Sequence, residues 1–155
     1  RDLWVLDLES GDATPWIATD YAETGGRFSP DGRWVAYQSD ESGLAEVYLQ
    51  SFPETRERIV VSTGGGRSPA WRADGGELYY LSAAGEIVAV PVAWEAGRPV
   101  PGEPQTLFRV RTRLYRPHGQ FDALPDGESF LVNRLVIEDG DEPLVLVQNW
   151  TDGRP

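Results

Sequence analysis

The chain has 155 residues, of which 40% are hydrophobic, 17 are Gly and 12 are Pro, so it is long enough for one turn-rich globular domain with its own core. Its net charge of −11 argues against nucleic acid or an anionic membrane as a partner. The sequence contains neither Cys nor Lys, which excludes disulfides, thiolate metal ligands, a cysteine nucleophile and a catalytic lysine. No run approaches the roughly 18 apolar residues of a membrane helix, so we expect no membrane insertion.

Strand patterns begin at the first residues of the chain. Asp2 to Leu8 is typical of a strand, Glu9 to Asp12 of a turn, and Trp16 to Thr19 of a second strand. Residues 1–20 therefore form half of a larger unit. Because the chain opens inside a strand, without Met or a signal-peptide pattern, we expect it to be an excised or processed piece.

A complete unit follows at 24–63. Ser29-Pro30-Asp31-Gly32 predicts a tight turn, because Pro presets φ, Asp can bond the backbone ahead of it, and Gly accepts a positive φ. Trp34 to Gln38 is aromatic and β-branched enough for a strand, Asp40 to Gly43 predicts a second turn, and Glu46 to Phe52 predicts a third strand. Val60 to Thr63 matches an outer fourth strand.

The same unit returns twice. The first turn recurs as Arg72 to Gly75 and as Leu124 to Gly127, each followed by an aromatic strand, and we interpret Asp31, Asp74 and Asp126 as turn formers. The repeated units are 67–110 and 118–150, the last having three strands that end with Leu144 to Trp150. A period of roughly 40 to 50 residues with four strands per unit is typical of propeller blades.

The predicted fold class is therefore all-β, a β-propeller of four-stranded antiparallel blades, with about three and a half blades in this chain. Because closed propellers generally have about 4 to 8 blades, the ring must be completed by a longer polypeptide or by self-association of copies.

The run FSPDGRWVAYQSDESG…EVYLQSF resembles the repeat of TolB-like propellers. The stretches STGGGRSPAWRADGGELYYLS, IVAVPV, FLVN and QNWT are similar to the C-terminal propeller region of bacterial transmembrane serine/threonine kinases. That resemblance implies a ligand- or protein-binding sensor module, a place outside the cytoplasm, and a natural C-terminus at or near Pro155. The second turn departs from the repeat, because Arg72-Ala73 replaces Ser-Pro.

Glycine-rich loops and one histidine mark the candidate site. In a propeller, the loops before the innermost strands meet at the mouth of the central channel, and arginine beside exposed backbone amides suits an anion. The alternative is that the glycines only let the chain pass between blades, and that the lone His is an ordinary loop residue rather than a metal ligand or base. The predicted ligand-binding residues are Arg27, Arg67, Arg116, His118 and Asp122.

From these residues we expect a non-catalytic binding or sensor module that contacts a protein or a small molecule at the propeller face, with no metal or cofactor. The alternative is a propeller hydrolase or lyase, or the accessory propeller of a serine peptidase of the prolyl-oligopeptidase type. Such a peptidase needs a Gly-x-Ser-x-Gly motif, and this sequence has none. We therefore expect no enzymatic activity from this chain.

Overall fold

The computed structural model describes residues 1–110 and 121–133, and in this part of the chain every regular element is a β-strand. The strands are β1 Leu3–Leu6, β2 Ala13–Ile17, β3 Thr24–Phe28, β4 Trp34–Ser39, β5 Glu46–Ser51, β6 Arg58–Val60, β7 Gly66–Trp71, β8 Glu77–Ser82, β9 Glu86–Glu95, β10 Arg98–Pro101, β11 Gln105–Arg109, β12 Phe121–Ala123 and β13 Phe130–Val132. The predicted all-β fold class is confirmed. The described residues contain no helix able to cross a membrane.

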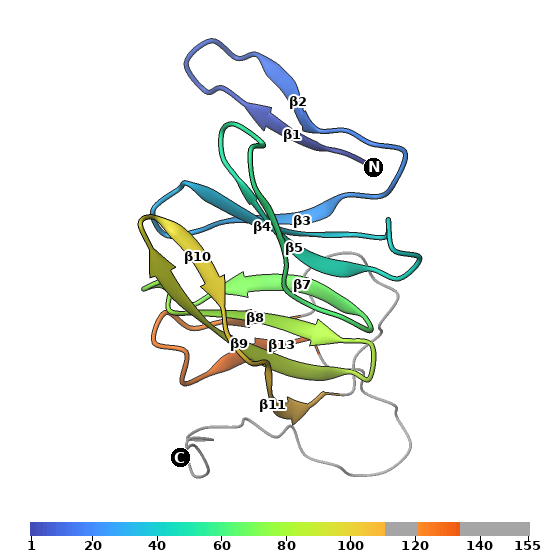
Figure 1. Ribbon diagram of the computed structural model, residues 1–155, viewed down its shortest axis with the longest axis vertical. Coiled ribbons are helices and arrows are strands. Elements are labelled where there is room, and N and C mark those ends of the chain that lie inside the picture. The colour runs from blue at the N-terminus through green and yellow to red at the C-terminus, as the bar shows by residue number, and fades with distance from the viewer. Residues whose placement is uncertain (111–120, 134–155) are drawn as a thin grey trace.

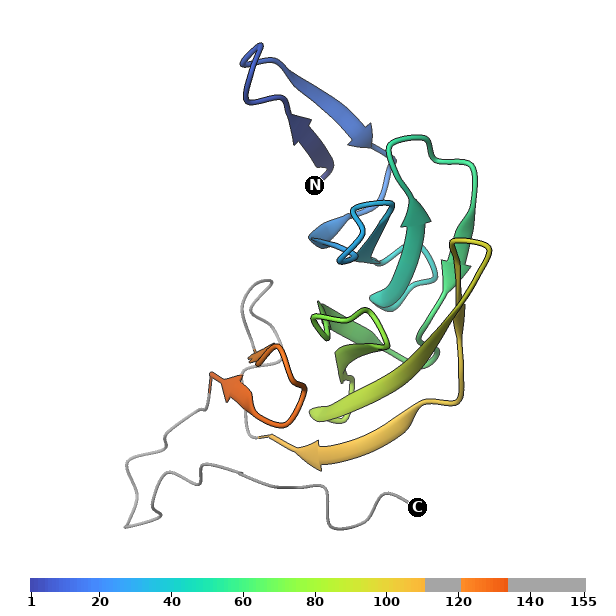
Figure 2. The same ribbon diagram turned by 90° about the vertical axis from the view of Figure 1, so that its left-hand side faces the viewer.

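The strands form successive antiparallel sheets that stack along the molecule (Figure 1). β1 pairs with β2, and the next sheet has the order β3-β4-β5-β6. The third sheet runs β7-β8-β9, with β11 and β10 pairing different halves of the long β9, and β12 pairs with β13. Figure 2 shows that the sheets follow an arc with β3 and β7 on its concave side. This arrangement is that of a partial propeller.

The three Asp-Gly turns have one geometry. The amides of Gly32, Gly75 and Gly127 each bond the carbonyl three residues earlier at 2.9 Å, and all three glycines have φ near 70°. In each turn the aspartate Oδ1 accepts a backbone N–H two residues ahead, so the sequence-based interpretation of these aspartates as turn formers is confirmed. A side chain at Gly127 would also clash with the Tyr79 hydroxyl, so this turn needs glycine for space as well as for φ.

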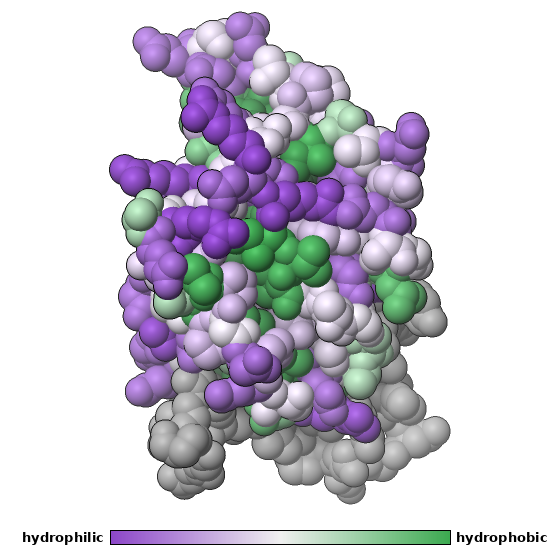
Figure 3. All heavy atoms as spheres, viewed as in Figure 1, coloured by the Kyte–Doolittle hydropathy of each residue, from purple (hydrophilic) through white to green (hydrophobic). Residues whose placement is uncertain are grey.

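Burial separates the inner sheets from the outer ones. Every residue of β4 is buried, as are the first five of β5 and of β8, because each of these sheets is covered on both faces. In β1 burial alternates instead, so Leu3 faces the neighbouring sheet while Trp4 and Leu6 are exposed. The hydrophobic core therefore lies between sheets. Figure 3 shows that hydrophilic side chains cover most of one face and surround a hydrophobic area near its centre.

Tryptophan indoles join neighbouring sheets. Trp16 Nε1 donates to the Pro53 carbonyl at 2.9 Å, and Trp71 Nε1 donates to the Arg27 carbonyl at 3.3 Å. Trp34 Nε1 donates to the Gly97 carbonyl at 3.0 Å and so joins the two complete sheets, the one formed by β3 to β6 and the one formed by β7 to β11. Each of these rings combines a large apolar surface with a polar atom that needs a partner.

Gly97 lies in a hairpin that the sequence analysis missed. The sequence pattern of the second unit predicts a third strand over Glu86 to Val92. In the structure β9 continues to Glu95 and turns back into β10 through Ala96-Gly97, both with positive φ. Positive φ at both central residues is the conformation that suits a two-residue hairpin. Arg98 in β10 pairs with Glu57 at 2.7 Å, so the hairpin is tied to the preceding sheet. The unit boundaries proposed from sequence stay predictions, and Leu144 to Trp150 lie outside the described residues.

We predict that Trp34→Phe destabilises the protein by about 1 to 3 kcal/mol, because it leaves the Gly97 carbonyl without its donor and shrinks a buried ring. The matched control is Trp4→Phe, at a ring that is 57% exposed, which should change stability by less than about 0.5 kcal/mol. Urea unfolding followed by circular dichroism gives both values. Equal losses in the two variants would contradict the bridging role of Trp34.

Candidate functional site

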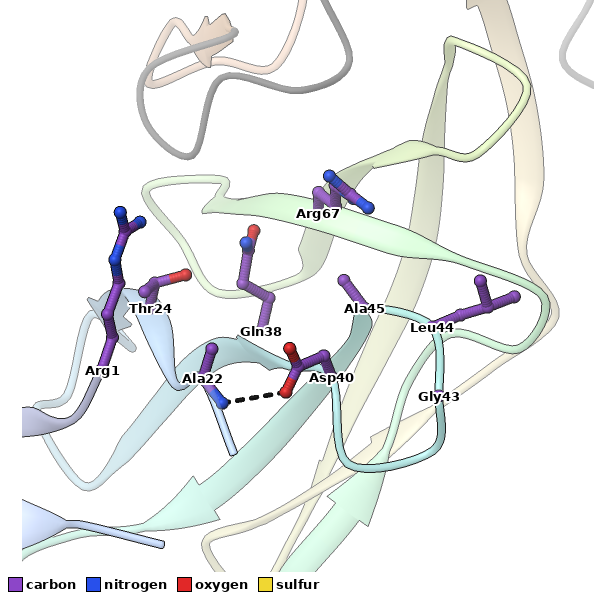
Figure 4. A pocket seen from close by; sticks show the side chains of 9 residues that line it. All are labelled: Arg1, Ala22, Thr24, Gln38, Asp40, Gly43, Leu44, Ala45 and Arg67. Carbon is purple, nitrogen blue, oxygen red and sulfur yellow. Dashed lines mark hydrogen bonds between the residues drawn. The ribbon is translucent and has the colours of Figure 1, made fainter. Parts of the chain in front are cut away.

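A pocket of about 370 Å³ opens where the first strands of the two complete sheets begin (Figure 4). Its volume lies in the range of small-ligand sites. Cationic, polar and apolar side chains all contribute to its wall. The lining residues are Arg1, Ala22, Thr24, Gln38, Asp40, Gly43, Leu44, Ala45 and Arg67.

Strand ends and one turn place these side chains. Thr24 is the first residue of β3 and lies opposite Gln38 near the end of β4. The chain then turns at Asp40 to Gly43, where the Gly43 amide bonds the Asp40 carbonyl and Gly43 has φ 91°. Asp40 Oδ1 accepts the Ala22 amide at 2.8 Å and so fixes the segment that leads into β3.

Gln38 joins the two sheets at the pocket. Its Oε1 accepts the amide of Ser68 in β7 at 2.8 Å, and only 8% of the residue is exposed. Ser68 has φ 53°, which is uncommon for a residue other than glycine. This cross-sheet bond fixes the start of β7 relative to β4, and with it the position of Arg67.

The loop before Arg67 is held by a buried carboxylate. Glu46 accepts hydrogen bonds from the Ser62 hydroxyl and from the Gly65 amide, the latter at 2.7 Å. The Gly66 amide also bonds the Ala45 carbonyl at 2.7 Å. These hydrogen bonds replace the ones that the Glu46 carboxylate would make with water. Glu46 is therefore satisfied although it is buried, and it holds the loop in place.

A second buried acid lies behind the pocket. Glu23, between the lining residues Ala22 and Thr24, is only 1% exposed and accepts a bond from the Thr19 hydroxyl through Oε1. Its Oε2 has no hydrogen-bond partner among the described residues. Burial raises the pKa of the neighbouring Tyr37 to about 12; the charges of Glu23 and Tyr48 add to this rise, and Arg58 opposes it.

The structure places three of the five predicted site residues. Arg67 lines the pocket. Arg27 lies in β3 opposite Ala36 and donates to the Gly26 carbonyl, and it is not among the lining residues. Asp122 lies in β12, at the position that matches Arg27 in β3. It is exposed, and its Oδ1 accepts the Ala123 amide.

Arg116 and His118 fall outside the described residues, so the convergence of all five predicted residues on one rim stays a prediction. Sequence reasoning missed Gln38 and Asp40 as site residues. A signal for Gln38 does exist, because the paired positions Thr24–Gln38 and Arg67–Leu81 are equivalent in the two sheets. The second unit therefore has a leucine where the first has a buried amide.

Comparisons with known proteins support the fold. No protein-family model matches the chain. An uncharacterized peptidase from Bacillus subtilis (strain 168), YuxL, is 31% identical over 87 residues, which are 55% of this chain and 13% of the peptidase. TolB from Acinetobacter baumannii superposes with a TM-score of 0.51 and 16% identity, over 84% of this chain and 42% of TolB. Oligogalacturonate lyase from Vibrio parahaemolyticus gives a TM-score of 0.56 and 17% identity, over 84% of this chain and 35% of the lyase.

The chain thus spans less than half of each of these three proteins, and the two solved structures show that it has a TolB-like β-propeller fold. The expectation of a protein without enzymatic activity is wrong, because the relative that is 31% identical over 87 residues is named as a peptidase. The expectation rests on the absence of a catalytic motif from these 155 residues. The similarity to the peptidase covers only 13% of that protein, so the absence of a motif here does not separate the chain from it.

We predict that the free energy of unfolding falls between pH 10 and pH 12 partly through Tyr37. Its folded pKa of about 12 exceeds the ordinary value of 10, so in this window the unfolded chain releases a proton that the folded protein keeps. The loss reaches roughly 2 kcal/mol and should be smaller in Tyr37→Phe. Urea unfolding of both proteins at pH 8, 10 and 11.5 measures this loss. At pH 8 tyrosine is protonated in the folded and the unfolded chain, so the difference between the two proteins there is the effect of the substitution on packing alone. Parallel pH profiles would contradict the assignment.

Proposed function

We propose that this chain is the propeller part of a peptide hydrolase of the prolyl-oligopeptidase type, and that its pocket helps to hold the peptide. The observation that carries the proposal is the 31% identity to a peptidase over 87 residues. A propeller fold alone would not support it, because this architecture carries many unrelated functions.

The pocket is consistent with this role. It lies where the first strands of neighbouring sheets begin (Figure 4), and its volume suits one or two amino-acid residues of a peptide. Leu44 and Ala45 offer an apolar wall, while Thr24 and Gln38 offer polar groups. A site of this composition binds and orients a chain through both backbone and side-chain contacts.

The chemical step would use groups from outside this sequence. A serine peptidase needs a nucleophile elbow with an Asp and a His later in the chain, and the 155 residues contain no Gly-x-Ser-x-Gly and a single histidine, His118. In the proposal a hydrolase domain provides the nucleophile and its base. The residues of this chain bind the substrate, orient it, and limit its size.

The proposal extends to the closure of the ring, the location of the protein and its relationship to other propellers. Further blades of a longer polypeptide would complete the ring, and self-association of copies is the alternative source of those blades. A place outside the cytoplasm and a relationship to the propellers of transmembrane kinases rest on the sequence resemblance alone. We retain the channel mouth, with Arg27, Arg67, Arg116, His118 and Asp122, as the wider surface that a ligand would meet.

We predict that the natural polypeptide carrying this sequence reacts with a fluorophosphonate probe at a serine and hydrolyses short N-acetylated peptides that keep a free C-terminal carboxylate. In that polypeptide Arg67→Gln should raise KM by about tenfold with little change in kcat, because Arg67 would bind substrate and transition state alike. Arg56→Gln is the matched control, since Arg56 is exposed and outside the pocket. The absence of both probe labelling and hydrolysis would refute the proposed function.

A further inference from the structure

We infer that the pocket at the start of β3 and β7 is a carboxylate-binding subsite, and that its ligand is the free C-terminal carboxylate of a peptide with an apolar last residue. The choice of a peptide rests on the proposed function. The choice of a carboxylate rests on the donors that the pocket presents, and these are independent of any catalytic activity.

Gln38 provides the first donor. Its Oε1 is engaged by the Ser68 amide, so the amide nitrogen points away from β7, toward the side on which Thr24 and Arg1 lie (Figure 4). No hydrogen bond from Nε2 to another described residue is present, although the residue is only 8% exposed. Nε2 is not among the fully buried atoms that lack a partner, so this N–H is open to the pocket and can donate to a ligand there.

The buried amide is not needed for packing at this position. Leu81 occupies the equivalent place in the next sheet, where it is 1% exposed in the core. Leucine therefore fills the site in one unit, while the other unit retains a polar group that faces a pocket. The cross-sheet bond to Ser68 accounts for the oxygen of Gln38 but leaves the nitrogen unexplained.

Three further side chains complete the donor set. The Thr24 hydroxyl and the guanidinium groups of Arg1 and Arg67 line the same space as Gln38. Guanidinium presents a planar fork of five N–H donors, so it can engage a carboxylate in addition to other contacts. Two arginines beside a neutral amide and a hydroxyl favour an anion, in a chain whose net charge is −11.

The remaining wall limits which anion fits. Asp40 faces the pocket from the turn side, and its Oδ1 already accepts the Ala22 amide. Its charge disfavours a second negative group on the ligand, while its other oxygen can accept the N–H of the last peptide bond. Leu44 and Ala45 then lie beside the terminal side chain. These features favour a monoanionic peptide end with an apolar side chain over a dicarboxylate.

The test compares acetyl-Ala-Leu with a free carboxylate and acetyl-Ala-Leu amide, using calorimetry on the 155-residue protein. We expect the carboxylate to bind at least about tenfold more tightly, and the difference to shrink at high salt. A galacturonate dimer, which carries its carboxylates on sugars, is the third ligand. Equal binding of the two peptides overturns the carboxylate site, and binding of the galacturonate dimer without the peptide overturns the peptide assignment.

Two variants locate the site. Gln38→Glu keeps an oxygen for the Ser68 amide but replaces the donor with a negative charge, so it should abolish the preference for the carboxylate peptide. Arg67→Gln should weaken binding of acetyl-Ala-Leu about tenfold and leave binding of acetyl-Ala-Leu amide unchanged. This variant replaces Gln38→Glu as the test if Gln38→Glu does not fold. Arg56→Gln removes one positive charge elsewhere and should change neither. An unchanged preference in Arg67→Gln refutes the location.

Binding and hydrolysis separate the two proposals. If the carboxylate preference is present while the natural polypeptide hydrolyses no peptide, the subsite stands and the proposed function fails. If peptides are hydrolysed but the preference is absent, the subsite fails and the proposed function stands.

Discussion

The structure depends on one constraint: its inner sheets are apolar on both faces and must be covered on both. β4 is buried along its whole length, which a sheet with one wet face would not allow. Stacking of sheets meets this need, and indole N–H groups such as that of Trp34 satisfy carbonyls of the neighbouring sheet at the same time. β1 is covered on one face only, so its residues are alternately half-buried and exposed, and Trp4 and Leu6 are exposed.

The candidate site is a consequence of that stacking. The pocket lies between the starts of β3 and β7, and the cross-sheet bonds from the Ser68 amide to Gln38 and from the Trp71 indole to the Arg27 carbonyl fix their relative position. Glu46 holds the loop that precedes Arg67. The residues that shape the pocket are therefore also residues that join the sheets, so binding there is coupled to the geometry of the whole stack.

The fold was predictable from the sequence because its signals are local. Asp31, Asp74 and Asp126 act within two residues of themselves, and their repetition revealed the period. The β9–β10 hairpin was missed because its Ala96-Gly97 turn departs from the repeat. Gln38 was missed because its partner lies 30 residues away in another sheet, a contact that no spacing rule predicts. Arg67 was found because glycines mark the loop before it.

The bond from the Ser68 amide to Gln38 joins the two complete sheets at the pocket. Amide hydrogen exchange at Ser68, followed by NMR, tests this claim. We predict that the Ser68 amide is protected to the same degree as the ladder amides of β8, because its acceptor belongs to a nearly buried side chain. Exchange of Ser68 at the rate of an unstructured amide would contradict the claim, and with it the geometry of the pocket.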